Sequence, residues 1–244
     1  MPGRLVLLDF DGTLAYRAGL WSGCALEVLD EHRPGHGIAI ERFRAAMQGG
    51  YPWNRHERPH PELGRPELWW AAMEARLARA FEQAGVGDGA PTLARRVRER
   101  FLDVNVAWRL FEDTRPALER LRSAGWRTAV LSNHVPELPV LVDGLGLGGL
   151  LEAVFSSASI GYEKPHPGAF AHALAACGRP ERVWMVGDNP EADVAGAEAA
   201  GIPAILVRGA GRAGRRAADL RGAVDMVLAG RPIRTSVRRH RMLR

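Results

Sequence analysis

Short apolar runs recur along the chain, and each ends in polar residues or glycine. These runs cover residues 5–8, 128–131, 153–155, 183–186 and 204–207. Stretches of helical pattern precede or separate the later runs, near residues 114–124, 136–143, 167–176 and 190–200. A buried parallel strand reads as a continuous apolar run, and its alternation with helices is typical of a doubly wound sheet. The pattern therefore predicts an α/β fold with a doubly wound parallel sheet.

The helix predicted near residues 114–124 has signals at both ends. Asp113 precedes it as a candidate N-cap, Pro116 lies in its first turn, and Gly125 follows its last turn. A side-chain oxygen at the N-cap can accept a hydrogen bond from a free backbone N–H, and glycine often ends a helix. We therefore expect Asp113 to cap this helix.

Strand signals disappear between Leu14 and Leu110, and helical patterns replace them. Helices are predicted near 20–32, over 66–84 and over 92–104, with a turn-rich loop at 49–60. Along 66–84 one face is apolar, with Trp69, Met73, Leu77, Ala80, Phe81 and Ala84. The insertion directly after the first strand predicts a helical cap at 15–110 over a core formed by 1–14 and 111–230, with hinges near 15–17 and 108–113.

Composition limits the class of protein. The chain has 244 residues, of which 46% are hydrophobic, as expected for a globular protein of one or two domains. It contains no apolar stretch near the roughly 20 residues that span a bilayer, and the first strand begins too early for a signal peptide. Its two cysteines, Cys24 and Cys177, suggest neither a disulfide framework nor a zinc site. We therefore expect a cytoplasmic protein without membrane contact.

The positive charge is concentrated at the C-terminus. Six arginines and no acidic residue follow Met226, at 231, 234, 238, 239, 241 and 244. The net charge is +5, so the rest of the chain carries 5 − 6 = −1. No aromatic residues alternate with these arginines, as they would in a single-strand nucleic-acid platform. We expect residues 231–244 to be a solvated basic tail, with no nucleic-acid partner.

Polar residues follow four of the predicted strands. The carboxyl ends of parallel strands meet at one edge of a sheet, where α/β proteins place their sites. A cluster of carboxylates there calls for a hard cation such as Mg²⁺, which in turn can bind phosphate oxygens. A hydroxyl and an ammonium group could hold the remaining oxygens. The residues at this edge are Asp9, Asp11, Ser132, Asn133, Lys164, Asp188 and Asp193.

Lys164 is the single lysine among 33 basic residues. A compact ammonium serves where the rigid guanidinium fork of arginine would not fit. Taken alone, each of these residues also has a simpler interpretation. Lys164 could be a surface lysine, and the pair Ser132 and Asn133 could form a turn. Asp188 and Asp193 could be helix caps.

Four short motifs occur in order at the predicted strand ends. They are Asp-Phe-Asp-Gly-Thr from Asp9, Ser-Asn at 132–133, Lys-Pro at 164–165, and Gly-Asp-x4-Asp at 187–193. Together they resemble the motifs of the haloacid dehalogenase superfamily. The position of the insertion resembles the helical-cap subclass, which includes phosphoglycolate phosphatases and β-phosphoglucomutases. The resemblance covers the chain up to the basic tail and implies a Rossmann-like core.

The resemblance implies a role for each motif residue. Asp9 would be the nucleophile that forms an aspartyl-phosphate, and Asp11 would be the general acid and base. Mg²⁺ would be held by Asp9, the Asp11 carbonyl and Asp188. The transferring phosphoryl group would be bound by Ser132, Asn133 and Lys164. Asp193 would support Lys164 or a metal-bound water, and Asn189 would support the same cluster.

Several activities occur in this superfamily. Asp11 favours phosphoryl chemistry, because the dehalogenases lack this second aspartate. Phosphonoacetaldehyde hydrolases use a cap lysine, and this cap has none. A Mg²⁺-dependent phosphatase acting on small phosphate monoesters is therefore expected. A phosphomutase is the alternative, since Arg17, Arg55 and Arg58 could grip a second phosphate. A non-catalytic binding protein would be expected only if Asp9, Asp11 or Asp188 were missing.

The predicted cap loop offers candidates for substrate specificity. These candidates are Trp53, Asn54, Arg55 and His56. Loop residues are more often free to contact a ligand than residues on an apolar helix face such as Trp69, which we expect to be packing. The substrate is predicted to be a small phosphorylated metabolite, such as a sugar, cyclitol or nucleoside phosphate. The sequence leaves the oligomeric state open.

Overall fold

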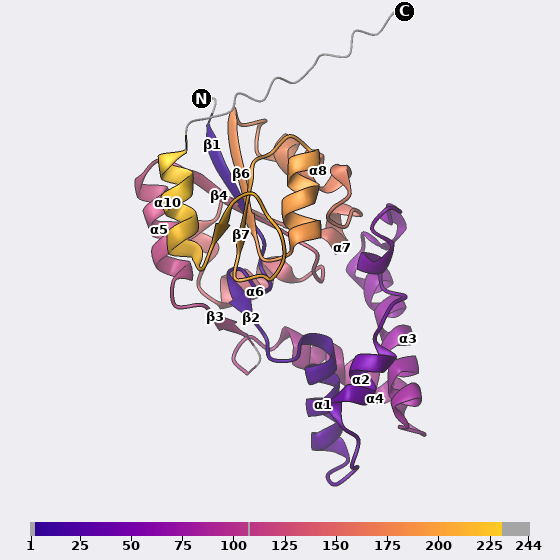
Figure 1. The fold of residues 1–244 in the computed structure, drawn as a ribbon. Coiled ribbons are helices and arrows are strands. Elements are labelled where there is room, and N and C mark those ends of the chain that lie inside the picture. The colour runs from indigo at the N-terminus through magenta and orange to yellow at the C-terminus, as the bar shows by residue number, and fades with distance from the viewer. Residues whose placement is uncertain (1–2, 107, 231–244) are drawn as a thin grey trace, which may run out of the picture.

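The computed structural model describes residues 3–106 and 108–230. Its main element is a parallel sheet with the strand order β5-β4-β1-β6-β7-β8 (Figure 1). The strands are β1 Arg4–Leu8, β4 Arg127–Ser132, β5 Ala153–Ser156, β6 Arg182–Gly187, β7 Ala204–Val207 and β8 Arg216–Ala217. All five apolar runs are strands, so the predicted α/β class is confirmed. The short strand β8 was not predicted.

Helices cover both faces of this sheet. In β1, Leu5 and Leu7 point to one face, and Val6 and Leu8 point to the other. The first face packs against α8 (Pro167–Ala176) and α9 (Gly196–Ala199). The second packs against α5 (Thr114–Ser123) and α10 (Leu220–Ala229). Because β1 is central and buried on both sides, the residues that follow it are held by a rigid element (Figure 1).

The predicted helix at 190–200 divides into two parts. Its first part, η4 (Pro190–Ala195), is a π-helix that leads into α9. The carbonyl of Asn189 accepts hydrogen bonds from the N–H groups of both Asp193, at 3.0 Å, and Val194, at 3.3 Å. π-turns of this kind are frequent at functional sites. This wider turn carries Asp193 inward, where its side chain is buried.

Further short helices complete the core. They are α6 Leu138–Gly144, α7 Ser157–Ile160 and the 3₁₀ turn η3 Gly148–Leu150. The helix predicted near 136–143 corresponds to α6. Both cysteines are buried and unpaired in the described part of the chain. Within residues 3–106 and 108–230, no helix has the length and apolar character that a membrane span requires. The predicted basic tail lies outside the described residues.

A helical insertion lies between β1 and β4 (Figure 1). Its helices are α1 Leu20–His32, α2 Ile40–Ala46, α3 Pro66–Ala84 and α4 Ala90–Leu102, with 3₁₀ turns η1 Pro52–Arg55 and η2 Pro61–Leu63. The helix predicted at 66–84 matches α3 at both ends. Helix α2 was missed because its seven residues bury only Phe43, which is too short a pattern to detect. The boundaries of the cap as a separate domain remain a prediction.

The apolar face of α3 is broader than predicted. All six predicted positions are buried, and so is Trp70. The Nε1–H of Trp70 donates to both carboxylate oxygens of Glu137 at 2.9 Å. Arg98 of α4 binds the same carboxylate at 3.1 Å. Glu137 precedes α6 of the core, so α3 and α4 contact the core as well as each other.

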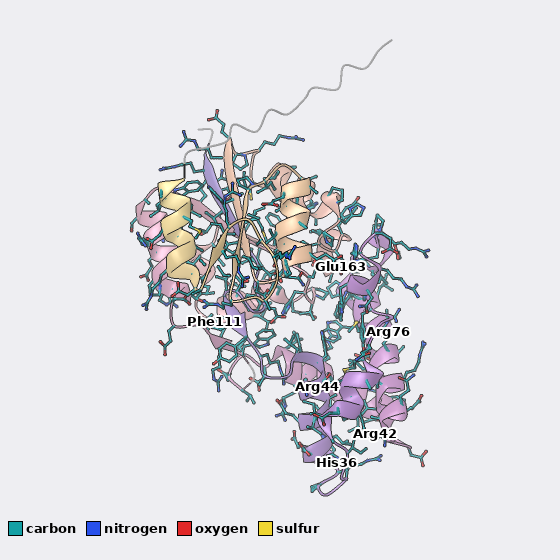
Figure 2. The ribbon with its side chains drawn as sticks, viewed as in Figure 1. His36, Arg42, Arg44, Arg76, Phe111 and Glu163 are labelled. Atoms are coloured by element: carbon teal, nitrogen blue, oxygen red, sulfur yellow. The ribbon has the colours of Figure 1, made fainter. Side chains whose placement is uncertain are left out.

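A two-stranded ribbon marks where the chain leaves the core and returns to it. Strand β2 (Ala15–Tyr16) pairs in the antiparallel direction with β3 (Arg109–Leu110). Next to it, the Arg208 guanidinium lies 3.9 Å from the ring centroid of Phe111 (Figure 2). The hinges predicted near 15–17 and 108–113 fall on this ribbon and its flanks. Their mobility remains a prediction.

Asp113 is the N-cap residue of α5, as predicted, and its carbonyl accepts the hydrogen bond of the Ala117 N–H at 3.0 Å. Its side chain makes no capping hydrogen bond with α5. Instead, Oδ2 accepts from the backbone N–H of Leu220 at 2.7 Å, and Oδ1 pairs with Arg208. Asp113 therefore binds the first turn of α10, which is distant in sequence and adjacent in the fold. Local capping rules cannot reveal such a partner.

Candidate active site

The turn after β1 places two aspartates at the carboxyl edge of the sheet. The backbone N–H of Asp9 continues the pairing with β6 by donating to Val186 at 2.9 Å. The chain then turns at Gly12, whose φ is 72°. A Cβ atom at Gly12 would collide with the carboxylate of Asp188. Glycine is therefore required here both for its left-handed backbone and for the close approach of Asp188.

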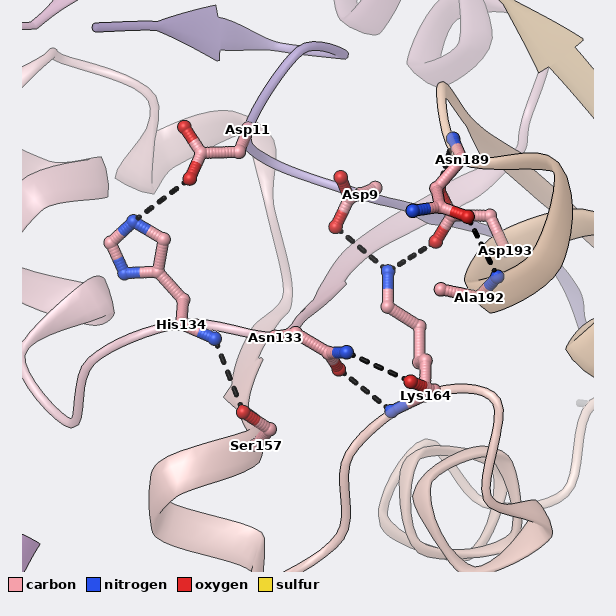
Figure 3. A network of polar contacts seen from close by, with 9 residues as sticks. All are labelled: Asp9, Asp11, Asn133, His134, Ser157, Lys164, Asn189, Ala192 and Asp193. Atoms are coloured by element: carbon pink, nitrogen blue, oxygen red, sulfur yellow. Dashed lines mark hydrogen bonds and ion pairs between the residues drawn. The ribbon is translucent and has the colours of Figure 1, made fainter. Parts of the chain in front are cut away.

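Lys164 lies at the centre of the polar cluster (Figure 3). Its Nζ donates to Asp9 Oδ1 at 2.7 Å and also pairs with Asp193 Oδ1. Lys164 is 2% exposed, so its interpretation as a surface lysine was wrong. Burial alone would lower the pKa of Lys164, but the carboxylates of Asp193 and Asp9 outweigh burial and raise it. The ammonium therefore stays charged in the folded protein.

Asn133 fixes the backbone that carries Lys164. The Asn133 Nδ2 donates to the Lys164 carbonyl at 2.8 Å, and the Lys164 N–H donates to Asn133 Oδ1 at 2.7 Å (Figure 3). The side-chain amide is thus occupied by the protein at both ends. The phosphate-binding role of Asn133, which also lines the cavity described below, stays a prediction.

The loop after β4 is held by two serines from the neighbouring strand end. Ser156 Oγ donates to the carbonyl oxygens of His134 and Val135 at 2.6 and 2.8 Å. Ser157 Oγ accepts from the His134 N–H at 3.1 Å. Ser132 ends β4, is buried, and lines the cavity described below. The predicted phosphate-binding residue Ser132 is therefore the last residue of a strand, directly before a loop that these hydrogen bonds hold.

Three carboxylates form a compact acidic cluster. Oxygen atoms of Asp9, Asp188 and Asp193 all lie within 4.8 Å of one another. Burial, together with the charges of Asp9 and Asp193, raises the pKa of Asp188 to about 7. Carboxylate oxygens are the ligands that Mg²⁺ prefers. Because the negative charges of these carboxylates repel one another, a bound cation would stabilise their ionised forms.

The cluster shares Asp9 and Asp188 with the predicted metal ligands. The third member, Asp193, is already engaged, because Oδ1 pairs with Lys164 and Oδ2 accepts from the Asn189 N–H at 3.0 Å. Asn189 in turn uses its side-chain Oδ1 to accept from two N–H groups of η4, at 2.9 Å each. Asp193 thus orients Lys164, and Asn189 orients Asp193.

Asp11 lies beside a histidine that the sequence analysis did not identify. His134 Nε2 is 3.8 Å from Asp11 Oδ2 (Figure 3). Burial, and then the charges of Asp9 and Asp188, raise the pKa of Asp11 well above its ordinary value. Burial lowers the pKa of His134 to about 3, so the ring is neutral. The aromatic rings around His134 are those of Phe10, Phe101 and Trp108.

His134 is the residue after the predicted Ser-Asn pair. This position was the only sign in the sequence that His134 could belong to the site, because nothing in the local sequence indicates where its side chain points. In the described residues neither ring nitrogen of His134 has a hydrogen-bond partner, and Asp11 Oδ1 also lacks one. Of these atoms, His134 Nε2 is the one that faces the Asp11 carboxylate, through Oδ2.

A cavity of about 560 Å³ lies between these residues and the cap. The cap residues that line it are Tyr16, Arg17, Leu20, Trp21, Trp53, His56 and Phe101. From the core it is lined by the motif residues, including Asp9, Asp11, Ser132, Asn133, Lys164, Asp188, Asn189 and Asp193. The tertiary structure therefore brings every predicted core site residue to one cavity.

The residues of the predicted specificity loop differ in whether they face the cavity. Trp53 and His56 line the cavity, whereas Asn54 and Arg55 are exposed and do not. Asn54 is used within the loop, since its Oδ1 accepts from the Tyr51 N–H at 3.1 Å. In the 3₁₀ turn η1, adjacent residues point in different directions, and only some can face the site. Of the four specificity candidates, Trp53 and His56 therefore line the cavity, and a role in specificity stays a prediction for all four.

Comparison with known proteins agrees with this arrangement. Residues 4–201 match the family described as haloacid dehalogenase-like hydrolase. The phosphoserine phosphatase of Thermus thermophilus is 37% identical over 228 residues, covering 84% of this chain and 88% of that protein. The haloacid dehalogenase-like hydrolase domain-containing protein 3 of Mus musculus is 30% identical over 182 residues, or 71% of each chain.

A solved structure shows the same fold. The magnesium-bound orthorhombic crystal form of the HAD-hydrolase YfnB from Bacillus subtilis superposes with a TM-score of 0.70. The match covers 93% of this chain and 99% of that one, at 16% sequence identity. At this identity the likeness concerns the fold alone. The core and its helical insertion are therefore a shared architecture.

Proposed function

The chain belongs to the haloacid dehalogenase-like hydrolases, and we propose that it is a Mg²⁺-dependent phosphatase of small-molecule phosphate monoesters. The observation that carries this proposal is the position of Asp9. Its Oδ1 is held 2.7 Å from Lys164 Nζ at the floor of the cavity, with the carboxyl of Asp11 two residues further on. The similarity to a phosphoserine phosphatase supports the same activity.

The proposed first step is attack by Asp9 on phosphorus. Lys164 is paired with Oδ1, which leaves Oδ2 to form the new bond to phosphorus while the bond to the leaving oxygen breaks. The product is an aspartyl-phosphate, which divides a difficult displacement into two easier ones. Lys164 offsets negative charge on the nucleophile and on the transferring group, and Ser132 can donate to a phosphate oxygen.

Asp11 is proposed to move the proton. Its raised pKa supports a protonated carboxyl, which can give its proton to the departing alkoxide oxygen. The resulting carboxylate can then take a proton from water as that water attacks phosphorus. This second attack breaks the bond to Asp9 and releases inorganic phosphate. Neutral His134 next to Asp11 adds no charge that would force Asp11 to ionise early.

The site fits Mg²⁺ because carboxylate oxygens of Asp9, Asp188 and Asp193 lie close together. The absence of a side chain at Gly12 also lets the Asp188 carboxylate approach the turn after β1. Asp9 and Asp188 would hold Mg²⁺, together with the backbone carbonyl of Asp11. When bound, it neutralises charge on the phosphoryl group. Asp193 then keeps Lys164 in place beside that group.

The cavity favours a phosphatase over a phosphomutase. A mutase must hold a second phosphate, for which Arg17, Arg55 and Arg58 were the candidates. Arg55 and Arg58 are exposed and do not line the cavity. Arg17 does line it, but it is 4% exposed and its guanidinium pairs with Glu27 at 2.7 Å. The second aspartate, Asp11, supports phosphoryl transfer over halide displacement.

Release of inorganic phosphate tests the proposal. We expect wild type to hydrolyse p-nitrophenyl phosphate and at least one phosphorylated metabolite with Mg²⁺, and to stop in EDTA. Asp9→Asn should reduce turnover by several orders of magnitude, whereas Asp225→Asn, a surface control paired with Arg120, should not. Full activity in EDTA, or in Asp9→Asn, would contradict the mechanism.

A further inference from the structure

We propose that the substrate carries a single phosphate and that its leaving group presents a planar aromatic or heteroaromatic ring to the cap. This inference rests on the proposed phosphatase function and concerns the half of the cavity that the motifs do not form. It depends on two independent observations. One is the set of aromatic rings in the cap wall. The other is the ion pair with Glu27 that offsets the charge of Arg17 in the same wall.

Two tryptophans form the aromatic part of the wall. Trp21 and Trp53 both line the cavity and are only half-buried. Their rings are nearly parallel, with an interplanar angle of 12° and centroids 6.2 Å apart. They come from different parts of the cap, since Trp21 lies in α1 and Trp53 in η1. The cap therefore gathers two ring faces that the sequence separates.

Each of these tryptophans is supported by a further ring. Trp21 stacks on Phe101 at 4.0 Å and 4°, and Trp53 stacks on Tyr51 at 4.8 Å and 7°. Phe101 and Tyr51 are 1% and 3% exposed, so they belong to the packed interior of the cap. A ring that is stacked on a buried neighbour loses little freedom when a ligand binds. The aromatic surface is thus ordered before any substrate arrives.

In the described residues, the guanidinium of the cap wall is already bound on two of its three nitrogens by the protein. Arg17 is the one arginine of the cap wall, and its side chain is 1% exposed. Nη2 pairs with Glu27 at 2.7 Å, and Nη1 donates to the carbonyls of Ala18 and Leu20 at 3.3 and 3.1 Å. Its Nε is buried inside the protein and lacks a partner there. Arg17 is therefore held against α1 through Nη1 and Nη2, and its charge is offset by Glu27.

The two ends of the cavity thus differ in chemistry. Asp9, Lys164 and Asp188 at the core end provide charge for one phosphate and its metal. At the cap end, Trp21 and Trp53 provide aromatic surface, with His56 as a neighbouring polar group. Aromatic faces attract rings by offset or edge contacts. A bisphosphate or a strongly polar leaving group would lose hydration here without gaining a charged partner.

The first experiment compares esters that each carry one phosphate. We expect the KM of wild type for 1-naphthyl phosphate to be at least about tenfold lower than for glycerol 1-phosphate, the size of effect that ring stacking can supply. Fructose 1,6-bisphosphate should be a poorer substrate than either. Trp53→Leu should abolish most of the naphthyl preference, mainly through KM. Trp53→Phe keeps a ring at the same position and should retain the naphthyl preference. That result would show that the effect of Trp53→Leu comes from loss of the ring.

A binding measurement separates this inference from the proposed function. We would measure by calorimetry the Kd of 1-naphthyl phosphate and of glycerol 1-phosphate for Asp9→Asn with Mg²⁺, and repeat both with Trp53→Leu added. Tighter binding of the naphthyl ester, lost with Trp53→Leu, supports the inference even if no ester is hydrolysed by wild type. Equal Kd values, or a preference that Trp53→Leu leaves intact, overturn it even if wild type is an active phosphatase.

Discussion

His60 Nε2 lies 3.1 Å from Glu163 Oε1, and both side chains are buried. His60 belongs to the cap, whereas Glu163 precedes Lys164 in the core and lies where the cap approaches it (Figure 2). The backbone N–H of His60 also donates to the carbonyl of Gly161 at 2.9 Å. The cap is therefore joined to the loop that carries Lys164 at a point far from the β2–β3 ribbon.

This pair predicts a pH-dependent contribution to stability. Burial opposes protonation of His60, but its hydrogen bond and charge interaction with Glu163 prevail and raise the pKa above 6.5. A raised pKa means that the contribution is complete below pH 6.5 and is lost as pH rises through the folded-state pKa. At pH 6, His60→Asn should lower the free energy of unfolding by about 2 kcal/mol. Urea unfolding of both proteins from pH 5.5 to 8.5 should show this difference shrinking. A difference that grows with pH would contradict the pair.

The single lysine predicts a selective chemical modification. Amine reagents can attack only Lys164 and the α-amino group. Acetylation of Lys164 would remove the cation that Asp9 and Asp193 share, so activity should fall in proportion to that modification. Mg²⁺ with vanadate should protect the residue, as mass spectrometry can measure. Lys164→Arg should not restore turnover, because a planar fork does not fit between these carboxylates. Normal turnover with Lys164 fully acetylated would refute its role.

Asp11 predicts a dependence on the leaving group. A general acid matters most when the departing alkoxide is strongly basic. Asp11→Asn should therefore lower kcat for an alkyl ester such as glycerol 1-phosphate by a factor at least about tenfold greater than for p-nitrophenyl phosphate. The two esters can be compared in one phosphate-release assay. Equal losses on both esters would assign Asp11 another role.

The close approach of Asp188 to Gly12 predicts that a side chain at position 12 disturbs the site. Gly35 serves as a control that has the same backbone strain but no such neighbour. Gly12 and Gly35 both have positive φ, of 72° and 80°. A Cβ at Gly12 would strike Asp188, whereas a Cβ at Gly35 would meet nothing within 4 Å. Alanine at either position should cost about 1–2 kcal/mol of stability from backbone strain. Only Gly12→Ala should also abolish phosphatase activity and weaken Mg²⁺ binding, measured by calorimetry. Equal activity in the two variants would show that the close approach is unimportant.

The amino-acid sequence by itself determined five strands of the six-stranded sheet and the motif positions. Apolar runs such as Leu5–Leu8 mark strands because burial of a central parallel strand requires apolar residues on both faces. The carboxyl ends of such strands converge, so Asp9, Ser132 and Asp188 could be assigned to one site without knowing any distance. The bounds of α3 followed in the same way from Pro66, Gly85 and the helical period between them.

Only the tertiary structure decided which side chains meet across elements. Asp113 binds α10, Trp70 binds Glu137, and His60 meets Glu163, and each pair is far apart in sequence. Likewise Trp53 faces the cavity while the adjacent Asn54 does not. Local patterns record which residues are buried or turn the chain, but the partner of a polar or aromatic group depends on how separate elements pack. For that reason the catalytic end of this cavity could be derived from sequence motifs, while its cap end became visible only in the folded chain.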